Sequence, residues 1–292
     1  MSKLPTAALL PKGTFSDEAA RYFFQGVPVE LKYQKMIADV FKSTARGDTD
    51  WSVVPIENTI DGSVSLHMDW LVHEVDLPIR AEWVFPAVQN LVGRRSELAE
   101  AGSSAWEPGR IKKVLSHPVA MAQCYEFLRS RLPHAELETL SSTAEAIRTV
   151  HDNPGLGWAA IGTKTAAADY GLDVLEESVT DHDNNFTRFL LVGNRPFGKA
   201  GASHHKTSIL ITLPEDYPGA LHQVLSAFAW RRINLSRIES RPTKKKLGNY
   251  YFFIDIEMSL DTVLLPAAIA EIEALGCQVR ILGSYPSFPY EG

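Results

Sequence analysis

The feature that most constrains the fold is a unit that recurs through the first two-thirds of the chain: an apolar strand, a short polar turn and then a helix. It appears as TAALL-PKGTFS-DEAARYFF, WSVVPI-ENTIDGS-VSLHMDWLVHE, IKKVL-SHP-VAMAQCYEFLRSRL and WAAIG-TKT-AAADYGL, and the turn in SSTAEAIRTV also starts a helix. Strands that alternate with helices predict parallel sheets covered by helices. Such sheets bind ligands at the carboxyl ends of their strands.

A different pattern follows the stretch NRPFGKAGASHHK, residues 194–206, which is rich in Gly, Pro and polar residues. Strands KTSILITL, INLSRIES, YYFFIDIEM and QVRILGSYP are interleaved with two helices in the order βαββαβ, which is the ferredoxin-like arrangement of a small regulatory or binding module. We therefore expect an α/β chain with a first domain over residues 1–195, a linker over 196–205, a second domain over 206–286 and a tail over 287–292.

Bulk properties exclude several classes of protein. The chain has 292 residues, of which 45% are hydrophobic and 22% charged, as in soluble globular proteins. A net charge of -6 argues against a nucleic-acid or anionic-membrane partner. We find neither a membrane-spanning run nor a signal peptide. Cys124 and Cys277 lie far apart in apolar patterns, which indicates buried free thiols in a reducing, cytoplasmic compartment.

The turns of the recurring units carry hydroxyl and amide groups at helix starts. Each alone reads as an ordinary helix N-cap. Several converging helix N-termini would suit a small anion such as a carboxylate or phosphate. Because the chain has no GxxxxGK[ST], GxGxxG, GxSxG, CxxC or HExxH motif, we expect no nucleotide cofactor and no metal.

The motifs KGTFSDEAA, VPIENTIDGSV, SHPVAMAQC, AAIGTKTAAADYGL and NNFTRFLLV resemble the successive motifs of prephenate dehydratases. DYPGALHQVL, INLSRIESRP and NYYFFIDIE resemble the ACT regulatory domain that follows in those enzymes. The resemblance covers nearly the whole chain, in order. It implies a catalytic region of two α/β lobes, similar to type II periplasmic binding proteins, with the substrate in the cleft between them.

The resemblance also implies an activity: loss of carbon dioxide and water from prephenate to give phenylpyruvate for phenylalanine biosynthesis. Prephenate carries two carboxylates and a ring hydroxyl, so the site needs carboxylate clamps and a proton donor near that hydroxyl. The family's threonine falls on Thr187, the expected donor or polariser of the leaving hydroxyl. The other residues that we assign to catalysis are Arg188, Glu57 and Asn58.

Arg188 has more than one possible role. Its guanidinium matches a carboxylate in a bidentate geometry. Neighbouring residues on a regular strand point to opposite faces, however, so Thr187 and Arg188 cannot both reach one ligand unless the backbone is irregular. Arg188 then braces the hinge between the lobes or forms a buried salt bridge, with Asp181, Asp183 or Glu57 as the partner. Glu57 repels a dianion and is expected to orient Arg188 or to take part in protonation.

Further cleft residues come from the other turns. Ser116 is a substrate ligand or only the N-cap before Pro118, and Gln123, inside a predicted helix, faces the cleft or the surface. The predicted substrate-binding residues are Thr14, Ser116, Gln123, Ser142, Thr143 and Thr163. Leu10 and Val119 stand where the family usually has glycine and glutamine, which bears on the shape of the cleft and on substrate choice.

In the ACT region, a glycine after Pro218 allows a ligand to approach the backbone. In the family, this segment and the ESRP motif of a neighbouring subunit enclose the amino acid; the alternative reading of ESRP is a charged strand end. The predicted phenylalanine-binding residues are Gly219, Ala220, Leu221, Asn234, Leu235, Glu239, Ser240 and Arg241.

We therefore expect a cofactor-free prephenate dehydratase with prephenate as its small-molecule substrate. Phenylalanine should inhibit it through the ACT domains of a homodimer or homotetramer. Arogenate dehydratase remains the alternative within the enzymes, and a non-catalytic amino-acid or keto-acid sensor is the alternative outside them. A sensor would tolerate Thr187→Ala, whereas an enzyme would lose most of its turnover.

Overall fold

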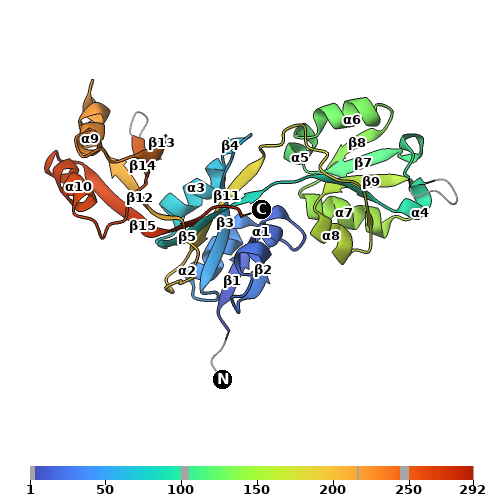
Figure 1. Cartoon of the computed structure of the whole chain (residues 1–292), viewed down its shortest axis with the longest axis horizontal. Helices are drawn as coiled ribbons and strands as arrows, with labels where there is room; N and C mark the ends of the chain where they lie inside the picture. The colour runs from blue at the N-terminus through green and yellow to red at the C-terminus, as the bar shows by residue number, and fades with distance from the viewer. Residues whose placement is uncertain (1–3, 100–104, 216, 244–249, 292) are drawn as a thin grey trace. The chain divides into compact units, whose positions relative to one another are not determined.

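The structure is a computed structural model, and it describes residues 4–99, 105–215, 217–243 and 250–291 (Figure 1). The chain forms two compact units. The first contains the residues up to Trp70 together with Phe85–Phe189, and the second contains Leu71–Val84 together with the residues from Leu190 onward. No helix within the described ranges is long and apolar enough to cross a membrane.

The first unit has two lobes. In the first lobe, β1 pairs in parallel with β2 and β3, and the short β4 pairs in antiparallel fashion with the end of β3. Strand β1 is buried along its whole length, with α2 packed against it. The elements are β1 (Thr6–Leu9), α1 (Phe15–Phe23), β2 (Glu30–Tyr33), α2 (Ile37–Ala45), β3 (Trp51–Asn58), β4 (Gly62–Ser63) and α3 (Ser65–Asp69), which continues into the π-helix Trp70–Glu74.

The second lobe is a five-stranded sheet in the order β10-β6-β9-β7-β8. Strands β7, β8 and β9 run parallel, and β6 and β10 add an antiparallel edge. Figure 1 shows α5 and α6 on one face and α7 and α8 on the other. The elements are β6 (Asn90–Gly93), α4 (Arg95–Leu98), the 3-10 helix Pro108–Arg110, β7 (Lys113–Ser116), α5 (Pro118–Ala122), α6 (Tyr125–Arg131), β8 (Glu136–Thr139), α7 (Thr143–Asp152), β9 (Trp158–Gly162), α8 (Lys164–Asp169) and β10 (Asp173–Glu176).

Two apolar cores hold this sheet between its helices. Val114 packs in a cluster with Leu128 on the α5–α6 side, and the next residue, Leu115, packs with Ile147 on the α7 side. Successive strand residues point to opposite faces, so a continuous apolar strand such as IKKVL is what a sheet covered on both sides requires.

The predicted helix over VAMAQCYEFLRSRL is wrong in one respect, because the chain leaves the helix at Gln123 and Cys124 and restarts as α6. Asp181 stabilises the break. Its backbone N–H donates to the Gln123 carbonyl at 2.8 Å, and its carboxylate accepts from the first backbone N–H groups of α6, those of Glu126 and Phe127. A carboxylate at a helix N-terminus also favours the helix dipole.

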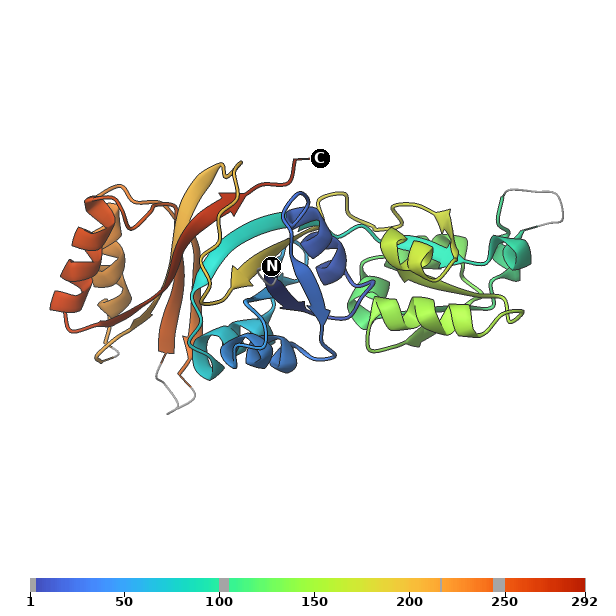
Figure 2. The same cartoon turned by 90° about the horizontal axis from the view of Figure 1, so that it is seen from below.

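The second unit is the predicted βαββαβ module, with a sheet in the order β13-β14-β12-β15 that is joined at the end of β15 by β5 in parallel. Figure 2 shows both of its helices on one face of the sheet. The elements are β12 (His204–Thr212), α9 (Ala220–Ala229), β13 (Leu235–Pro242), β14 (Tyr250–Ile256), α10 (Leu264–Ala274) and β15 (Gln278–Phe288), and two strands, β5 (Ile79–Pro86) and β11 (Phe186–Val192), pass from one unit to the other.

Both ends of this module extend beyond the strands that the sequence predicts. His204 and His205, placed in the linker, already belong to β12, and β15 continues through Pro286 to Phe288 in what was read as a tail. A buried ion pair explains the extension: Lys206 Nζ lies 2.8 Å from a carboxylate oxygen of Glu82 on β5, which also accepts from the Ser287 hydroxyl at 2.6 Å. The two-lobed α/β region and the ferredoxin-like module are otherwise the predicted fold class.

Candidate active site

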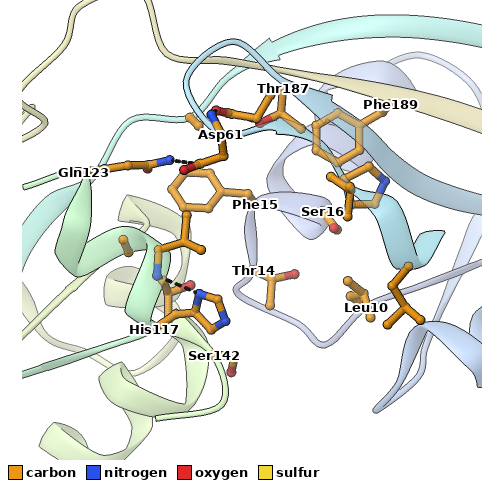
Figure 3. Close-up of a pocket in the computed structure, with 18 of the residues that line it drawn as sticks. Leu10, Thr14, Phe15, Ser16, Asp61, His117, Gln123, Ser142, Thr187 and Phe189 are labelled. Carbon is orange, nitrogen blue, oxygen red and sulfur yellow. Dashed lines mark hydrogen bonds between the residues drawn. The ribbon is translucent and has the colours of Figure 1, made fainter. Parts of the chain in front are cut away.

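The first unit contains a cavity of about 590 Å³ between its two lobes (Figure 3). Its volume falls in the range of small-molecule sites. In the first lobe, the wall is formed by residues 14–16 at the start of α1, by Asn58 at the end of β3 and by residues 61–66 that follow β3. In the second lobe, it is formed by residues 117, 119, 120 and 123 around α5 and by residues 141–143 at the start of α7. Gln89, and Thr187 with Phe189 on β11, complete the wall together with Leu10, Pro55 and Ala87. The cavity therefore lies at the carboxyl ends of strands, where the sequence predicts ligand binding.

Two helices of nine and ten residues, α1 and α7, begin on the cavity wall. Their first N–H groups and their dipoles favour a negatively charged ligand. Ser16 and Thr143 lie in these first turns, are nearly fully buried, and their hydroxyls donate to no other described group. Burial lowers the pKa of His117, so this imidazole is neutral at neutral pH. Among the described wall residues there is no Lys or Arg, which leaves an anion to the helix starts and hydroxyls.

Thr187 lies on the cavity wall, and its hydroxyl has a defined partner. Asn58 Nδ2 donates to Thr187 Oγ1 at 3.0 Å, to the Phe186 carbonyl at 3.1 Å and to Asn185 Oδ1 at 2.8 Å. Because Thr187 accepts from Asn58, its own hydroxyl proton remains available to a ligand. Phe189, two residues along the strand, lies on the same wall, and Figure 3 shows its ring next to Thr187.

Arg188 points to the other face of β11, as the period of a regular strand requires. It is absent from the described cavity wall, its side chain is 10% exposed, and its guanidinium lies 3.4 Å from a carboxylate oxygen of Glu57. The salt bridge to Glu57, one of the alternatives given by the sequence, is present. Glu57 and Asn58 are the last two residues of β3, whereas the sequence pattern predicts them in the turn after that strand.

Gln123 faces the cavity, and its amide joins three polar side chains. Its Nε2 donates to Asp61 Oδ2 at 2.6 Å, and its Oε1 accepts from Asn185 Nδ2 at 3.0 Å and from Gln89 Nε2 at 3.2 Å. At the break between α5 and α6, its backbone N–H still donates to the Val119 carbonyl, whereas its own carbonyl accepts from the Asp181 N–H instead of from the helix. The Asp61–Gln123 bond spans the two lobes at the end of the cavity nearest Thr187 (Figure 3).

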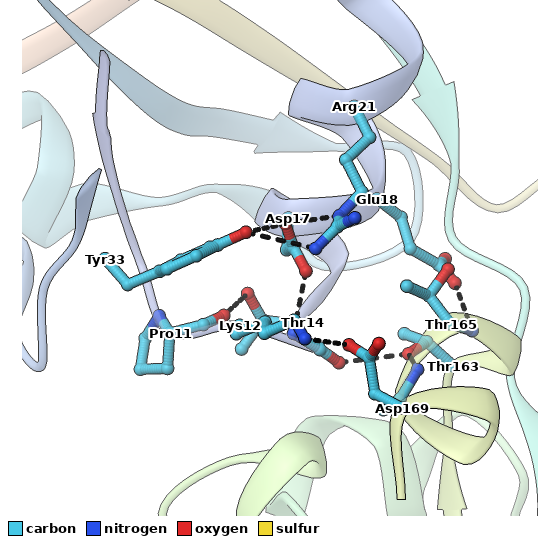
Figure 4. A network of polar contacts seen from close by, with 12 residues as sticks. Pro11, Lys12, Thr14, Asp17, Glu18, Arg21, Tyr33, Thr163, Thr165 and Asp169 are labelled. Atoms are coloured by element: carbon cyan, nitrogen blue, oxygen red, sulfur yellow. Dashed lines mark hydrogen bonds and ion pairs between the residues drawn. The ribbon is translucent and has the colours of Figure 1, made fainter. Parts of the chain in front are cut away.

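A second group of contacts joins the lobes beside the cavity, and we call it the clasp (Figure 4). Thr163 Oγ1 donates to the Gly13 carbonyl at 3.0 Å and accepts from the Ala166 backbone N–H at 3.1 Å. The Thr165 backbone N–H donates to Glu18 Oε1 at 3.0 Å. Lys12 pairs with Asp169 at 3.0 Å.

The first-lobe side of the clasp is fixed by Asp17, which is fully buried. Its carboxylate accepts from the Gly13 backbone N–H, Arg21 Nε and the Tyr33 hydroxyl, each at 2.9 Å. Gly13 has φ +80, and a Cβ there would lie 2.9 Å from the Cβ of Ala166, so both conformation and space require glycine. The clasp thereby positions the loop that carries Thr14, Phe15 and Ser16 to the cavity.

The other predicted substrate-binding residues divide into two groups. Thr14, Ser142 and Thr143 line the cavity, although Thr14 Oγ1 donates to the Pro11 carbonyl and Ser142 Oγ caps α7 by accepting from the Glu145 N–H. Ser116 and Thr163 lie outside the described wall and are fully buried. The Ser116 hydroxyl donates to the Ile161 carbonyl, and the N-cap of α5 is His117, not Ser116. Leu10 and Val119, the departures from the family pattern, both line the cavity.

The predicted site residues do not include Ser16, Asp61, Gln89, His117, Asn185 or the two phenylalanines of the wall. Phe189 was within reach, because it follows Thr187 at the spacing of one strand face. Asn185 stands in the motif that carries Thr187. Nothing in the sequence singles out Asp61 or Gln89, since their positions depend on contacts between lobes.

The predicted effector residues lie at the start of α9 and along β13. Gly219 caps α9 with φ +94, a left-handed conformation that favours glycine. Asn234 Nδ2 donates to Glu257 at 2.6 Å. Side chains alternate along β13, so Glu239 and Arg241 share the half-buried face and pair at 3.1 Å, whereas Ser240 lies on the exposed face. Ala220 is buried, and Leu221 and Leu235 are half-buried.

Within the described ranges no group of three or more His, Cys, Asp or Glu side chains could hold a metal. Both cysteines are free and buried. Burial, with a smaller contribution from Asp181, raises the pKa of Cys124, and burial raises that of Cys277. Neither thiol is therefore an activated nucleophile.

The fold and the site together define a two-lobed α/β protein with a hydroxyl-lined, anion-accepting cleft and a ferredoxin-like module. The family model of prephenate dehydratase matches residues 6–197, and the model of the ACT domain matches residues 207–276. The chain belongs to the prephenate dehydratase family.

Three proteins are similar to this chain over nearly its whole length. The prephenate dehydratase of Bacillus subtilis strain 168 is 40% identical over 284 residues, which cover 95% of this chain and 97% of that protein. The structure of the prephenate dehydratase of Arthrobacter aurescens in complex with L-Phe has a TM-score of 0.82 at 33% identity, covering 96% of this chain and 89% of that one. The structure of GqqA, described as a novel type of quorum quenching acylase, has a TM-score of 0.81 at 25% identity, covering 97% of this chain and 98% of that one.

Proposed function

We propose that this chain is a prephenate dehydratase that converts prephenate to phenylpyruvate, carbon dioxide and water. The observation that carries the proposal is the hydroxyl of Thr187, which faces the cavity, accepts from Asn58 and keeps its own proton for a ligand. Membership of the family and the similarity to the enzyme of Bacillus subtilis support the same activity.

The geometry supports a simple division of roles. The starts of α1 and α7, with the hydroxyls of Ser16 and Thr143, hold the carboxylates of the substrate. As the ring carboxylate leaves as carbon dioxide, its bonding electrons move into the ring and expel the ring hydroxyl. Thr187 donates a proton to this leaving group, which departs as water, and solvent replaces the proton on Thr187. A positioned acid contributes about 10²–10⁴-fold in rate.

Gln89 is a candidate for the second contact to the ring hydroxyl. Its Oε1 is buried and accepts no hydrogen bond from the described residues. The ring hydroxyl is the one donor that prephenate dianion offers. An acceptor for its hydrogen and the Thr187 donor for its oxygen would orient the leaving group.

The test is phenylpyruvate formation by the purified protein, measured with prephenate and separately with arogenate, each with and without phenylalanine. Turnover of prephenate that phenylalanine suppresses would support the proposal. No turnover of either substrate by a folded protein that binds phenylalanine would identify a sensor instead.

Arogenate is a second candidate substrate because of Asp61. Arogenate carries an ammonium where prephenate has a keto group. Oxygen Oδ1 of Asp61 has no partner among the described residues, and a carboxylate in the cavity wall can accept from an ammonium. If arogenate is used, Asp61→Asn should raise the KM for arogenate more than that for prephenate.

The regulatory part of the proposal rests on the ACT domain and on the relative that was solved in complex with L-Phe. We propose that phenylalanine binds the start of α9 and the ESRP segment of a second subunit, in a homodimer or homotetramer acting in the cytoplasm. We also keep residues 1–195 as the catalytic domain and 206–286 as the regulatory domain. Light scattering with and without phenylalanine would test the oligomer.

A further inference from the structure

Three amide side chains connect Asp61 to Thr187 in one continuous series of hydrogen bonds. Gln123 Nε2 donates to Asp61 Oδ2 at 2.6 Å, and Asn185 Nδ2 donates to Gln123 Oε1 at 3.0 Å. Asn58 Nδ2 then donates to Asn185 Oδ1 at 2.8 Å and to Thr187 Oγ1 at 3.0 Å. Asn185 and Gln123 are buried, so water cannot readily take the place of a missing partner.

The direction of this series is fixed at both ends. At one end the Asp61 carboxylate can only accept, so Gln123 must present its NH₂ group to it and its Oε1 to Asn185. At the other end the backbone N–H groups of Ile60 and Asp61, at 2.8 and 3.0 Å, can only donate, so Asn58 must present Oδ1 to them and Nδ2 to β11. Both ends therefore require the same orientation of every amide between them.

This direction decides the role of the Thr187 hydroxyl. Asn58 Nδ2 has two hydrogens and three acceptors within reach. The shortest of the three bonds, to Asn185, takes one hydrogen and fixes the rotation of the amide. The other hydrogen is then directed at the Phe186 carbonyl and Thr187 Oγ1. A reversed amide would instead accept the Thr187 proton and remove it from the cavity.

We propose that Asn185 is a positioning residue, which keeps the Thr187 hydroxyl a donor toward the cavity by orienting Asn58. The inference rests on the proposed dehydratase function for its kinetic consequence. Asn185 itself lies outside the described cavity wall, so its effect should appear in kcat and leave KM nearly unchanged.

The first variant is Asn185→Asp, which keeps the shape of the side chain and removes its donor. Two acceptors then face each other at Gln123, and turning the Gln123 amide only moves the conflict to Asp61. Asp at position 185 still accepts from Asn58, so the effect must reach Asn58 through Asp61, whose backbone N–H donates to Asn58 Oδ1 at 3.0 Å. The conflict displaces Asp61 and frees the Asn58 amide to turn, and we expect kcat to fall about 10- to 100-fold, as for the loss of one buried hydrogen bond to a charged or oriented group. Asn184→Asp is the matched control, because Asn184 is exposed and its side chain forms no hydrogen bond to a described residue. This variant should keep the wild-type kcat.

The second variant restores the series in the opposite direction. In Asp61→Asn/Asn185→Asp, Asn at position 61 can donate to Gln123 Oε1, and Gln123 Nε2 can donate to Asp at position 185. Gln89 can follow, because its buried Oε1, which accepts nothing from the described residues in the wild type, would accept from Gln123. Asp at position 185 still accepts from Asn58. Turning Gln89 takes its Oε1 away from the ring hydroxyl, so we expect the double variant to regain part of the kcat that Asn185→Asp loses and most of the lost Tm.

The same cycle is measured in thermal unfolding, which needs no turnover: Asn185→Asp should lower the Tm, and adding Asp61→Asn should raise it again. Wild-type kcat in Asn185→Asp would overturn the inference. A double variant no better than the product of the single effects in kcat and the sum of the single shifts in Tm would overturn it as well. A wild type that forms no phenylpyruvate but shows the Tm coupling would instead overturn the proposed function and leave the oriented series standing.

Discussion

Thr163→Val tests the clasp that joins the two lobes. Valine has nearly the shape of threonine, so the change removes one hydroxyl and leaves no cavity. The Gly13 carbonyl and the Ala166 N–H, which are both buried, then lose the hydrogen bonds that the Thr163 hydroxyl supplies. Loss of an N-cap costs about 1 kcal/mol, and a buried acceptor without a partner costs about 1–3 kcal/mol. We therefore expect the free energy of unfolding to fall by about 2–4 kcal/mol.

The assay is urea denaturation, in which the unfolding free energy of Thr163→Val is compared with that of the control variant Thr149→Val. Thr149 Oγ1 donates to the Glu145 carbonyl four residues earlier in α7, a carbonyl that the helix ladder already uses, so its removal should cost little. Thr163→Val should also lower kcat/KM, because the clasp positions the loop of Thr14 and Ser16. A Thr163→Val protein as stable as Thr149→Val would refute the reasoning that the clasp holds the lobes together.

Three further predictions follow from single contacts. Arg188→Met should leave the KM for prephenate almost unchanged and lower stability, because Arg188 pairs with Glu57 outside the described cavity wall; a large rise in KM in steady-state kinetics would contradict this. Burial raises the pKa of Glu18 above its ordinary 4.5, so its contribution to stability is present below that value and is lost as pH rises through the raised pKa. Glu18→Gln should therefore show an unfolding free energy that falls less steeply as pH rises above 4.5, and an unchanged slope would contradict this. Gly219→Ala should cost about 1–2 kcal/mol through its positive φ alone and weaken inhibition by phenylalanine without slowing uninhibited turnover, and full inhibition in the variant would refute the effector assignment.

The sequence predicts the elements of the site better than its contacts. The opposite directions of Thr187 and Arg188 follow from the strand period and are observed. The cap readings of Ser142 and of the Thr163 turn are also observed, because N-caps depend on residues three positions apart. The last strand was predicted to end at Pro286, but its pairing with β5 carries it on to Phe288.

What the sequence could not supply is the pairing of distant side chains. Thr163 and Gly13 are 150 residues apart, and Gln123 lies 62 residues from both Asp61 and Asn185. Gln123 appeared to lie inside a helix because its neighbours have helical spacing, and only the contacts of Asp181 end that helix early. Local propensity predicts elements, whereas the orientation of an amide depends on partners that the fold brings to it.

The most direct test of the account is kcat for prephenate in wild type, Thr187→Ser and Thr187→Val. Serine keeps a hydroxyl that can accept from Asn58 and donate to the leaving group, whereas valine keeps the size and removes both functions. We predict that Thr187→Ser retains most of the turnover and that Thr187→Val loses about 10²–10⁴-fold in kcat with intact folding. A Thr187→Val protein that turns over prephenate at the wild-type rate would contradict the central claim that this hydroxyl delivers the proton to the departing water.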